Sequence, residues 1–253
     1  DSKQQTANSN GLDALPLEDR WILSRVEGLA RSVDEQMRKF ELGEAARQVY
    51  EFVWSEFADW YIEIAKVRVR GTNAEGTGES VAAGDSPLPV LAYVLEQSLR
   101  LLHPFMPFVT EELWQALTPK IDGIEDDALI VAAYPRGESG YADAAAEREM
   151  ELLIDVVRAI RNIRAEKKVE PAKFIEAYVV ADGARGVLEA GAPYIEMLSR
   201  ARPLHIVGDI SEAPKDQVAT AVLEGVTAVV PLAGLFDTAA ERARLGKLIA
   251  DAE

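Results

Sequence analysis

The spacing of apolar residues changes at Pro171, and this change limits the folds open to the chain. Before Pro171, apolar side chains recur every three or four positions, as at Ile22, Val26, Leu29 and Val33, which is the period of a helix buried along one face. Beyond it, short apolar runs are bounded by turn residues, a pattern typical of strands. The sequence therefore predicts a mainly α chain, with a helical bundle followed by a small α+β domain.

The bundle is expected to contain several long helices. The predicted helical stretches are 17–40, 42–64, 91–102 and 142–168. The second stretch is unusually aromatic, with Tyr50, Phe52, Trp54, Phe57, Trp60 and Tyr61. Aromatic side chains on several faces of one helix indicate burial among other helices, so we interpret these residues as core. Stacking of some of them on nucleobases is the alternative.

Two prolines interrupt the apolar run LLHPFMPFVTEELWQAL at residues 101–117. Pro104 disfavours the helical conformation in His103, so we expect His103 to leave the α region and the helix to end there. Pro107 suits the first turn of a new helix, where the missing N–H costs nothing, and Thr118–Pro119 closes that helix. We interpret the stretch as a sharp corner between two helices, and His103 as structural rather than catalytic.

The second domain is predicted from short apolar runs and one helix. Strands are expected at 175–180 and 204–207, a helix at 184–201 that breaks near Pro193, and a hairpin of 218–223 and 226–230 around Glu224–Gly225. A separate extended piece is expected at 129–134. The predicted organisation is a disordered polar tail at 1–16, the bundle at 17–168 with a mobile loop at 71–89, the α+β domain at 169–232 and a further amphipathic helix at 233–253.

Composition excludes several classes of function. The net charge of −16 argues against a general affinity for nucleic acid or anionic membranes, so RNA binding would need a local basic patch. The absence of cysteine excludes disulfides and thiolate catalysis. That absence also fits a cytoplasmic location. No apolar run is long enough for a membrane span, and no signal sequence opens the chain. We find no phosphate-binding glycine loop and no metal-spaced histidine pair, and predict no catalytic residue, metal or cofactor in this chain.

Two clusters of Lys and Arg stand out against the acidic background. The first ends the aromatic helix at Lys66, Arg68 and Arg70. The second follows the long helix at Arg158, Arg161, Arg164, Lys167 and Lys168. The arginines of the second cluster are three apart and stay on neighbouring faces of the helix. In an acidic chain, both clusters could follow a phosphate backbone. The alternative is that they are ordinary solvated faces, or cations that suit the C-terminal end of a helix dipole.

Several segments, in order along the chain, resemble the post-catalytic part of the valyl-tRNA synthetases. The segments are LEDRWILSRV at 17–26, RQVYEFVWSEFADWYIEIAK at 47–66, LRLLHPFMPFVTEELWQAL at 99–117, VVRAIRNIRAEKKVEP at 156–171 and VVPLAGLFDTAAERARLGKLIADAE at 229–253. The H-P-F-M-P-F and E-E-L-W motifs are shared with the isoleucine and leucine enzymes. The W-S-E-F-A-D-W-Y segment and the last segment favour valine.

This resemblance implies an anticodon-binding bundle of the class Ia synthetase type, a small α+β domain and, at 233–253, the start of a coiled-coil arm. It implies a C-terminal fragment of an enzyme that attaches valine to tRNA with ATP and Mg²⁺, because the H-I-G-H and K-M-S-K-S motifs, the editing domain and an N-K-L-W-N-A-like first helix are not in this sequence. The implied partners are valine tRNA and the catalytic and editing domains. We expect a monomer, with both basic clusters on the RNA backbone.

Two other interpretations stay open. The bundle could come from the isoleucine or leucine branch of the synthetases, which reads a different anticodon. It could also be a helical protein–protein interaction module without an RNA role. Binding of tRNA by the chain separates these possibilities.

Overall fold

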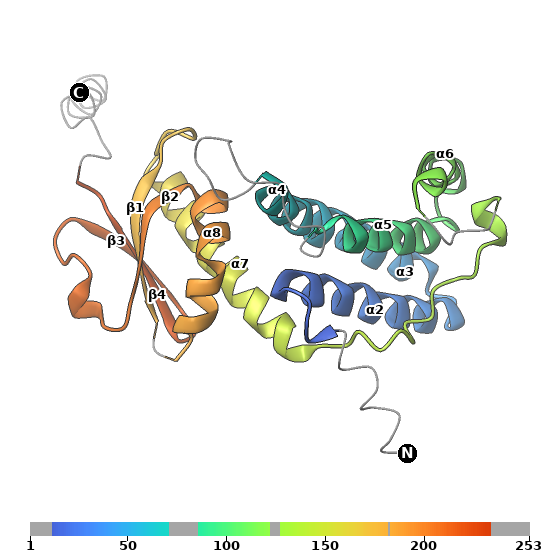
Figure 1. Ribbon diagram of the computed structural model, residues 1–253, viewed down its shortest axis with the longest axis horizontal. Coiled ribbons are helices and arrows are strands. Elements are labelled where there is room, and N and C mark those ends of the chain that lie inside the picture. Colours follow the sequence, from blue (N-terminus) through green and yellow to red (C-terminus); the bar gives the residue numbers. More distant parts are fainter. Residues whose placement is uncertain (1–11, 71–85, 122–126, 182, 234–253) are drawn as a thin grey trace, which may run out of the picture. The chain divides into compact units, whose positions relative to one another are not determined.

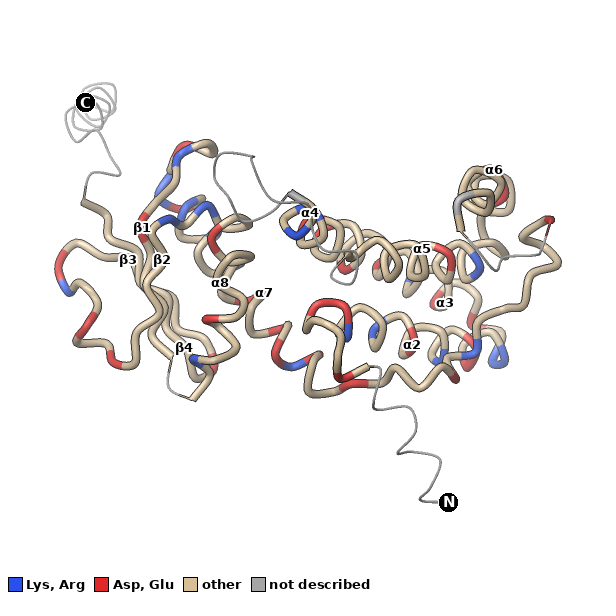
Figure 2. The backbone as a smooth tube through the Cα atoms, in the orientation of Figure 1, with Lys and Arg blue, Asp and Glu red and all other residues tan. Residues whose placement is uncertain are grey.

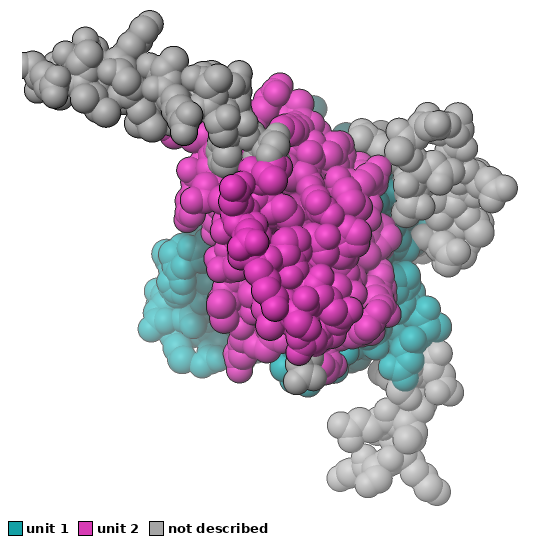
Figure 3. Space-filling view, turned by 90° about the vertical axis from the view of Figure 1, so that its left-hand side faces the viewer, with its two compact units in different colours: residues 1–150 teal, residues 151–253 magenta. Residues whose placement is uncertain are grey.

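The computed structural model describes residues 12–70, 86–121, 127–181 and 183–233. The chain divides into two compact units, residues 1–150 and 151–253, which Figure 3 colours separately. The division falls inside helix α7 (Ala144–Glu166), 18 residues before the boundary expected after residue 168. The predicted fold class, a helical bundle followed by a small α+β domain, is confirmed (Figure 1).

Unit 1 is built from helices whose apolar stripes face one another. Its elements are α2 (Leu17–Arg38), α3 (Leu42–Glu51), the π-helical segment η1 (Phe52–Ile62), α4 (Glu63–Arg70), α5 (Leu88–Leu102) and α6 (Pro107–Leu117). Ile22, Val33 and Val49 are fully buried, as the helical period predicts. Short 3₁₀ turns follow at Thr118–Lys120 and Leu129–Val131. The second turn corrects the extended piece expected at 129–134.

The aromatic helix is continuous from α3 to α4, but its middle is π-helical. Phe52 and Phe57 are five residues apart and both buried, a spacing that fits the i→i+5 hydrogen bonds of this segment. Trp60 and Tyr61 are also buried, which confirms the core prediction for these four rings. The prediction was wrong for Tyr50 and Trp54. These residues are 60% and 61% exposed, and their rings stack on each other with centroids 6.4 Å apart.

The corner between α5 and α6 forms as predicted, but His103 stays helical, with φ −54° and ψ −41°. Its N–H still donates to the Leu99 carbonyl at 3.0 Å, and this hydrogen bond keeps the turn helical in front of Pro104. The break falls at Met106, with φ −136° and ψ 59°, directly before Pro107 opens α6. The prediction that His103 leaves the α region was therefore wrong.

Unit 2 is a four-stranded sheet covered by helices. Its elements are β1 (Ile175–Ala181), α8 (Arg185–Ser199), β2 (Ala201–Val207), a 3₁₀ turn (Ile210–Glu212), β3 (Val218–Leu223) and β4 (Val226–Pro231). The order across the sheet is β2-β1-β4-β3, with β1 and β2 parallel and joined through α8. The hairpin of β3 and β4 turns at Glu224–Gly225 as predicted. Helix α8 runs through Pro193, so the expected break there was wrong.

The buried face of the sheet carries alternate residues of β1. Ile175, Ala177 and Val179 are buried, and Figure 1 shows α8 and the second half of α7 against one face of the sheet. Ile175 also donates its N–H to the carbonyl of Arg200 at 3.0 Å. The end of α8 and the starts of β1 and β2 therefore lie together, and Arg164 of α7 contacts the same place through the carbonyl of Arg200.

Candidate nucleic-acid interface

Two arginines of the second predicted cluster bind the end of helix α8. Arg161 donates from Nε to the carbonyl of Leu198 at 2.7 Å. Arg164 donates from Nη1 to the carbonyl of Arg200 at 3.3 Å and from Nη2 to that of Glu170 at 3.1 Å. A helix leaves its last carbonyl groups without intrahelical partners, so both arginines of α7 act as caps for α8.

Arg164 is a structural residue in this arrangement. It is only 7% exposed, and burial, together with the nearby charge of Arg200, lowers the pKa of its guanidinium group. Its three carbonyl partners include Pro171, at 3.5 Å, in the segment that leads into β1. A guanidinium group held in this way is not available to a phosphate.

The other predicted cations of α7 point outward. Arg158 is 55% exposed and forms an ion pair with Asp155, on the previous turn, at 3.3 Å. Lys167 is half-buried and Lys168 is exposed. Lys168 has φ +51° and ends the helix, because Val169 turns back and donates its N–H to the carbonyl of Arg164 at 2.9 Å. This left-handed turn places Lys168 at the C-terminus of α7.

The fold adds three cations that the sequence analysis missed, Lys173, Arg200 and Arg202. Lys173 and Arg200 are exposed, and Arg202 is half-buried. Figure 2 shows Lys and Arg positions gathered at the end of unit 2 where α7 and α8 terminate and β1 and β2 begin. We call this region the α7–α8 basic surface. Its members are Arg158, Arg161, Lys167, Lys168, Lys173, Arg200 and Arg202.

Acidic side chains balance part of this surface. Glu166 and Glu170 are exposed on the same segments, and Glu196 pairs with Arg202 at 3.0 Å. The cations nevertheless outnumber them, in a chain whose net charge is −16. The α7–α8 basic surface is therefore a local positive patch of the kind that could hold a phosphate backbone.

The first predicted cluster is different, because its central member is buried. Arg68 is 10% exposed at its side chain and lies 2.7 Å from Asp19 and 3.2 Å from Glu18, both buried in α2. Asp19 also accepts a hydrogen bond of 2.6 Å from the hydroxyl of Tyr61. Burial, with the charge of Asp19, holds the pKa of Tyr61 well above its ordinary value, so this hydroxyl remains a donor.

The flanking members of that cluster contribute little to a basic surface. Lys66 is exposed but pairs with Glu63 on the previous turn at 2.5 Å. The side chain of Arg70 lies outside the described residues. Arg68 therefore joins α4 to α2 inside unit 1, and among the side chains that the structure describes Lys66 is the one member of the cluster that faces solvent.

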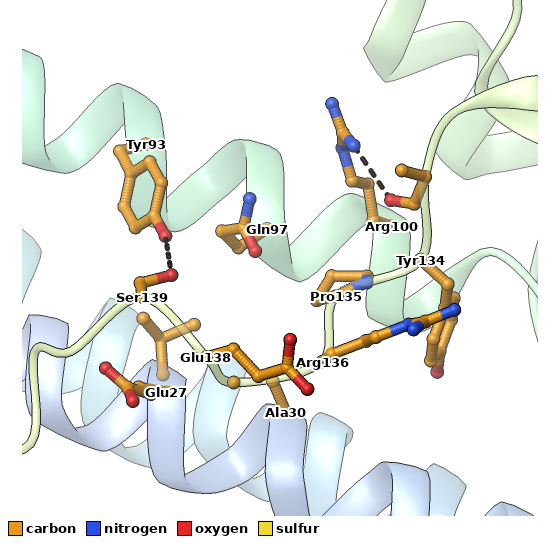
Figure 4. A pocket seen from close by; sticks show the side chains of 13 residues that line it. Glu27, Ala30, Tyr93, Gln97, Arg100, Tyr134, Pro135, Arg136, Glu138 and Ser139 are labelled. Carbon is orange, nitrogen blue, oxygen red and sulfur yellow. Dashed lines mark hydrogen bonds between the residues drawn. The ribbon is translucent and has the colours of Figure 1, made fainter. Parts of the chain in front are cut away.

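A cavity of about 550 Å³ lies in unit 1 between α2, α5 and residues 133–139 (Figure 4). Arg100 donates to the carbonyl of Ala133 at 2.8 Å, and the hydroxyls of Tyr93 and Ser139 are 3.3 Å apart. Figure 4 shows these side chains spread along the cavity wall rather than aimed at one point. The geometry therefore does not form a convergent catalytic set.

The histidines make local contacts. His103 Nδ1 lies 2.8 Å from the hydroxyl of Thr110 across the α5–α6 corner, and His205 Nε2 lies 3.1 Å from Glu176 on the neighbouring strand. In the ranges that the structure describes, no three His, Asp or Glu side chains are placed to hold a metal ion. No helix within those ranges is long and apolar enough to cross a membrane.

Comparison with known proteins gives a consistent result. Residues 19–179 match the family described as the anticodon-binding domain of tRNA ligase. The valine–tRNA ligase of Dehalococcoides mccartyi strain CBDB1 is 42% identical over 241 residues, which cover 94% of this chain and 26% of the relative. That of Bacillus cereus strain ATCC 10987 is 41% identical over 231 residues, covering 90% and 25%. The chain thus spans about a quarter of the length of the curated relatives it matches.

Proposed function

The chain belongs to the anticodon-binding domain family of tRNA ligases, and from this premise we propose that it is the tRNA-binding C-terminal region of a valine–tRNA ligase. The whole protein would be an aminoacyl-tRNA synthetase that attaches valine to tRNA with ATP and Mg²⁺ in the cytoplasm. Those ligands would be held by catalytic parts outside this chain. The proposed partners are valine tRNA and the catalytic and editing domains, and the proposed state is a monomer.

The proposed role of this region is recognition of the anticodon rather than catalysis. Anticodon bases are unpaired, so a protein can read them through hydrogen bonds and stacking while Lys and Arg hold the phosphates. The identity of the relatives favours the valine branch over the isoleucine and leucine branches. The coiled-coil start proposed at 233–253 lies outside the described residues, as do most of the tail and most of the 71–89 loop.

The observation that carries the RNA role is the α7–α8 basic surface on an otherwise acidic chain. Arg158, Lys167 and Lys168 supply backbone contacts in this proposal, and Arg161 adds its positive charge while it caps α8. Of the other candidates predicted from sequence, Lys66 and Arg70 stay proposed contacts. Arg68 and Arg164 act through the fold, because their guanidinium groups bind partners inside their own units.

The test is tRNA binding by the 253-residue chain at low and near-physiological salt. The ligands are valine tRNA, the same tRNA with an exchanged anticodon, and isoleucine tRNA. We expect preference for the valine anticodon. Reversal of Arg158 and Lys167 to Glu should make the negative slope of log K against log salt shallower, by roughly 0.7–0.9 per lost phosphate contact.

The matched control is Arg185→Glu, at the opposite end of α8 and 58% exposed. This variant should bind as the wild type does, because Arg185 lies outside the basic surface. Equal, salt-sensitive binding of all three tRNAs would contradict anticodon reading by this chain, and binding of none of them would contradict the RNA role altogether.

A further inference from the structure

One aromatic ring lies within the α7–α8 basic surface. Phe174 is 40% exposed, in the short segment between α7 and β1. The guanidinium carbons of Arg200 and Arg202 lie 5.7 Å and 5.4 Å from the centre of its ring, within the range of cation–π attraction. The sheet produces this grouping, because β2 begins beside β1 and brings residues 200–202 next to residue 174.

The two arginines are held in different ways. Arg202 is anchored by Glu196 at 3.0 Å and by the sulfur of Met197 at 3.6 Å. Arg200 donates to the carbonyl of Ala172 at 3.4 Å, and no carboxylate in the described parts of the chain lies within 4.0 Å of its guanidinium group. Arg200 is therefore oriented by the protein but keeps an uncompensated charge and donors for an anionic ligand.

Two cations at this end of unit 2 have a left-handed backbone conformation. Arg200 has φ +53° and ψ +45° and ends α8, as Lys168 with φ +51° ends α7. Glycine is the usual residue at such left-handed positions, because any side chain there is strained. Both helices instead end in a cation at the same end of unit 2. Phe40 and Gln217 share this conformation, so it shows only that Arg200 and Lys168 stand where glycine would cost less energy.

We propose that Phe174, Arg200 and Arg202 form a binding site for one unpaired nucleotide of tRNA. The base stacks on the exposed part of the Phe174 ring and on the neighbouring guanidinium planes, and its phosphate binds Arg200, with Lys168 and Lys173 nearby. The proposal rests on the proposed function, because it takes tRNA as the ligand, and it adds the place in unit 2 where a base is held.

A purely internal role for the three side chains makes different predictions. If the arginines only bind Phe174 and favour the negative ends of the two helices, their removal changes stability and leaves RNA affinity unchanged. If they bind a nucleotide, glycine in place of Lys168 or Arg200 removes a positive charge that binds RNA and also relieves the backbone strain. Affinity then falls while stability is kept, a combination that a structural role does not produce.

The experiment uses Arg200→Gly and Lys168→Gly, which preserve the backbone, and Phe174→Leu, which keeps an apolar side chain but removes the ring. Phe174→Tyr should restore stacking. Arg185→Ala, on the same helix but outside the basic surface, is the control for loss of an exposed arginine. Thermal unfolding of each variant checks that the fold is retained.

The probes are valine tRNA transcripts, each with a different unpaired nucleotide replaced by an abasic site. We expect one abasic position to weaken wild-type binding by roughly 5- to 150-fold, the range for loss of one stacked base. The same abasic site should cause little further loss of affinity in the Phe174→Leu chain, because the stacking contact is already absent there. Arg200→Gly should weaken binding of the intact transcript at least about fivefold with an unchanged or higher Tm.

Two results would overturn the inference. The first is wild-type affinity in both Phe174→Leu and Arg200→Gly. The second is a loss of affinity in these variants together with a full additional loss at every abasic position, so that no abasic site has a smaller effect in the variants than in the wild type. In either case the wild-type chain still binds tRNA and the proposed function stands. Failure of the wild-type chain to bind any transcript would instead overturn the proposed function, and the nucleotide site with it.

Discussion

Replacing Arg68 by methionine tests whether the first basic cluster is structural. The guanidinium group of Arg68 lies 2.7 Å from Asp19 and 3.2 Å from Glu18, and the two carboxylate side chains are only 3% and 4% exposed. Asp19 keeps the Tyr61 hydroxyl as a neutral donor in the variant, but both carboxylates lose their charge partner. Methionine fills a similar length of apolar space, so the main effect is electrostatic.

The magnitude follows from the burial of this group. Removal of one partner from a buried ion pair costs about 3–5 kcal/mol, because the remaining charge is left uncompensated in a poorly solvated site. For a chain of this size such a loss corresponds to a fall in Tm of roughly 6–20 °C. An exposed pair gives a small effect, so Lys66→Met, which breaks the pair with Glu63, should cost less than about 1 kcal/mol.

Urea unfolding of the wild type, Arg68→Met and Lys66→Met provides the measurement. A third variant, Arg68→Met with Glu18→Gln and Asp19→Asn, should recover most of the loss, because it removes the buried charges as well. The reasoning would be refuted if Arg68→Met unfolded within about 1 kcal/mol of the wild type while its affinity for tRNA fell about tenfold or more. Arg68 would then contact RNA directly.

Three further changes test other parts of the fold. Gly137→Ala should destabilise unit 1 for two reasons. A side chain at a φ of +69° costs about 1–2 kcal/mol, and the new Cβ, 2.5 Å from the Glu27 carbonyl oxygen, costs about 1–3 kcal/mol more. A urea midpoint equal to that of the wild type would count against this packing. Gly191→Ala places a Cβ 2.5 Å from a methyl group of buried Leu153 and should cost about 1–3 kcal/mol, with partial recovery in Gly191→Ala/Leu153→Val. Burial raises the pKa of Tyr134 to about 12, above its unfolded value of 10.0. The contribution of Tyr134 to the free energy of unfolding is therefore present below pH 10 and is lost as the pH rises towards 12. Tyr134→Phe should flatten the fall in stability across that interval, and an unchanged alkaline profile would exclude Tyr134 as its source.

The order of helices and strands could be predicted from sequence because it depends on local patterns. The period of apolar residues placed the helices, Pro107 marked the start of α6, and Glu224–Gly225 marked the hairpin. The exposure of Tyr50 and Trp54 was missed for a physical reason. Aromatic residues on several faces were taken to indicate burial on every side, but one face of this helix is open to solvent, and Tyr50 and Trp54 stack on each other there.

The functional surface was harder to predict, because its members are distant in sequence. Arg158 and Lys168 were found as a cluster on one helix. Arg200 and Arg202 join them only when β2 pairs with β1, and no short motif records that pairing. Arg68 was read as exposed because its acidic partners lie 49 and 50 residues away in α2. Charge patterns along one helix therefore identify candidates, but the partners across the fold decide which of them face solvent.

The contacts between α2 and residues 141–147 have a consequence for the order of folding during synthesis. Glu27 and Ser24 are buried in α2, and they accept hydrogen bonds from the N–H groups of Tyr141 and Asp143, 114 and 119 residues later in the chain. At about 5–20 residues per second, a ribosome adds that stretch in roughly 6–24 s. Until then these two side chains of α2 lack their native partners, so a nascent chain that ends before residue 141 cannot form the complete bundle.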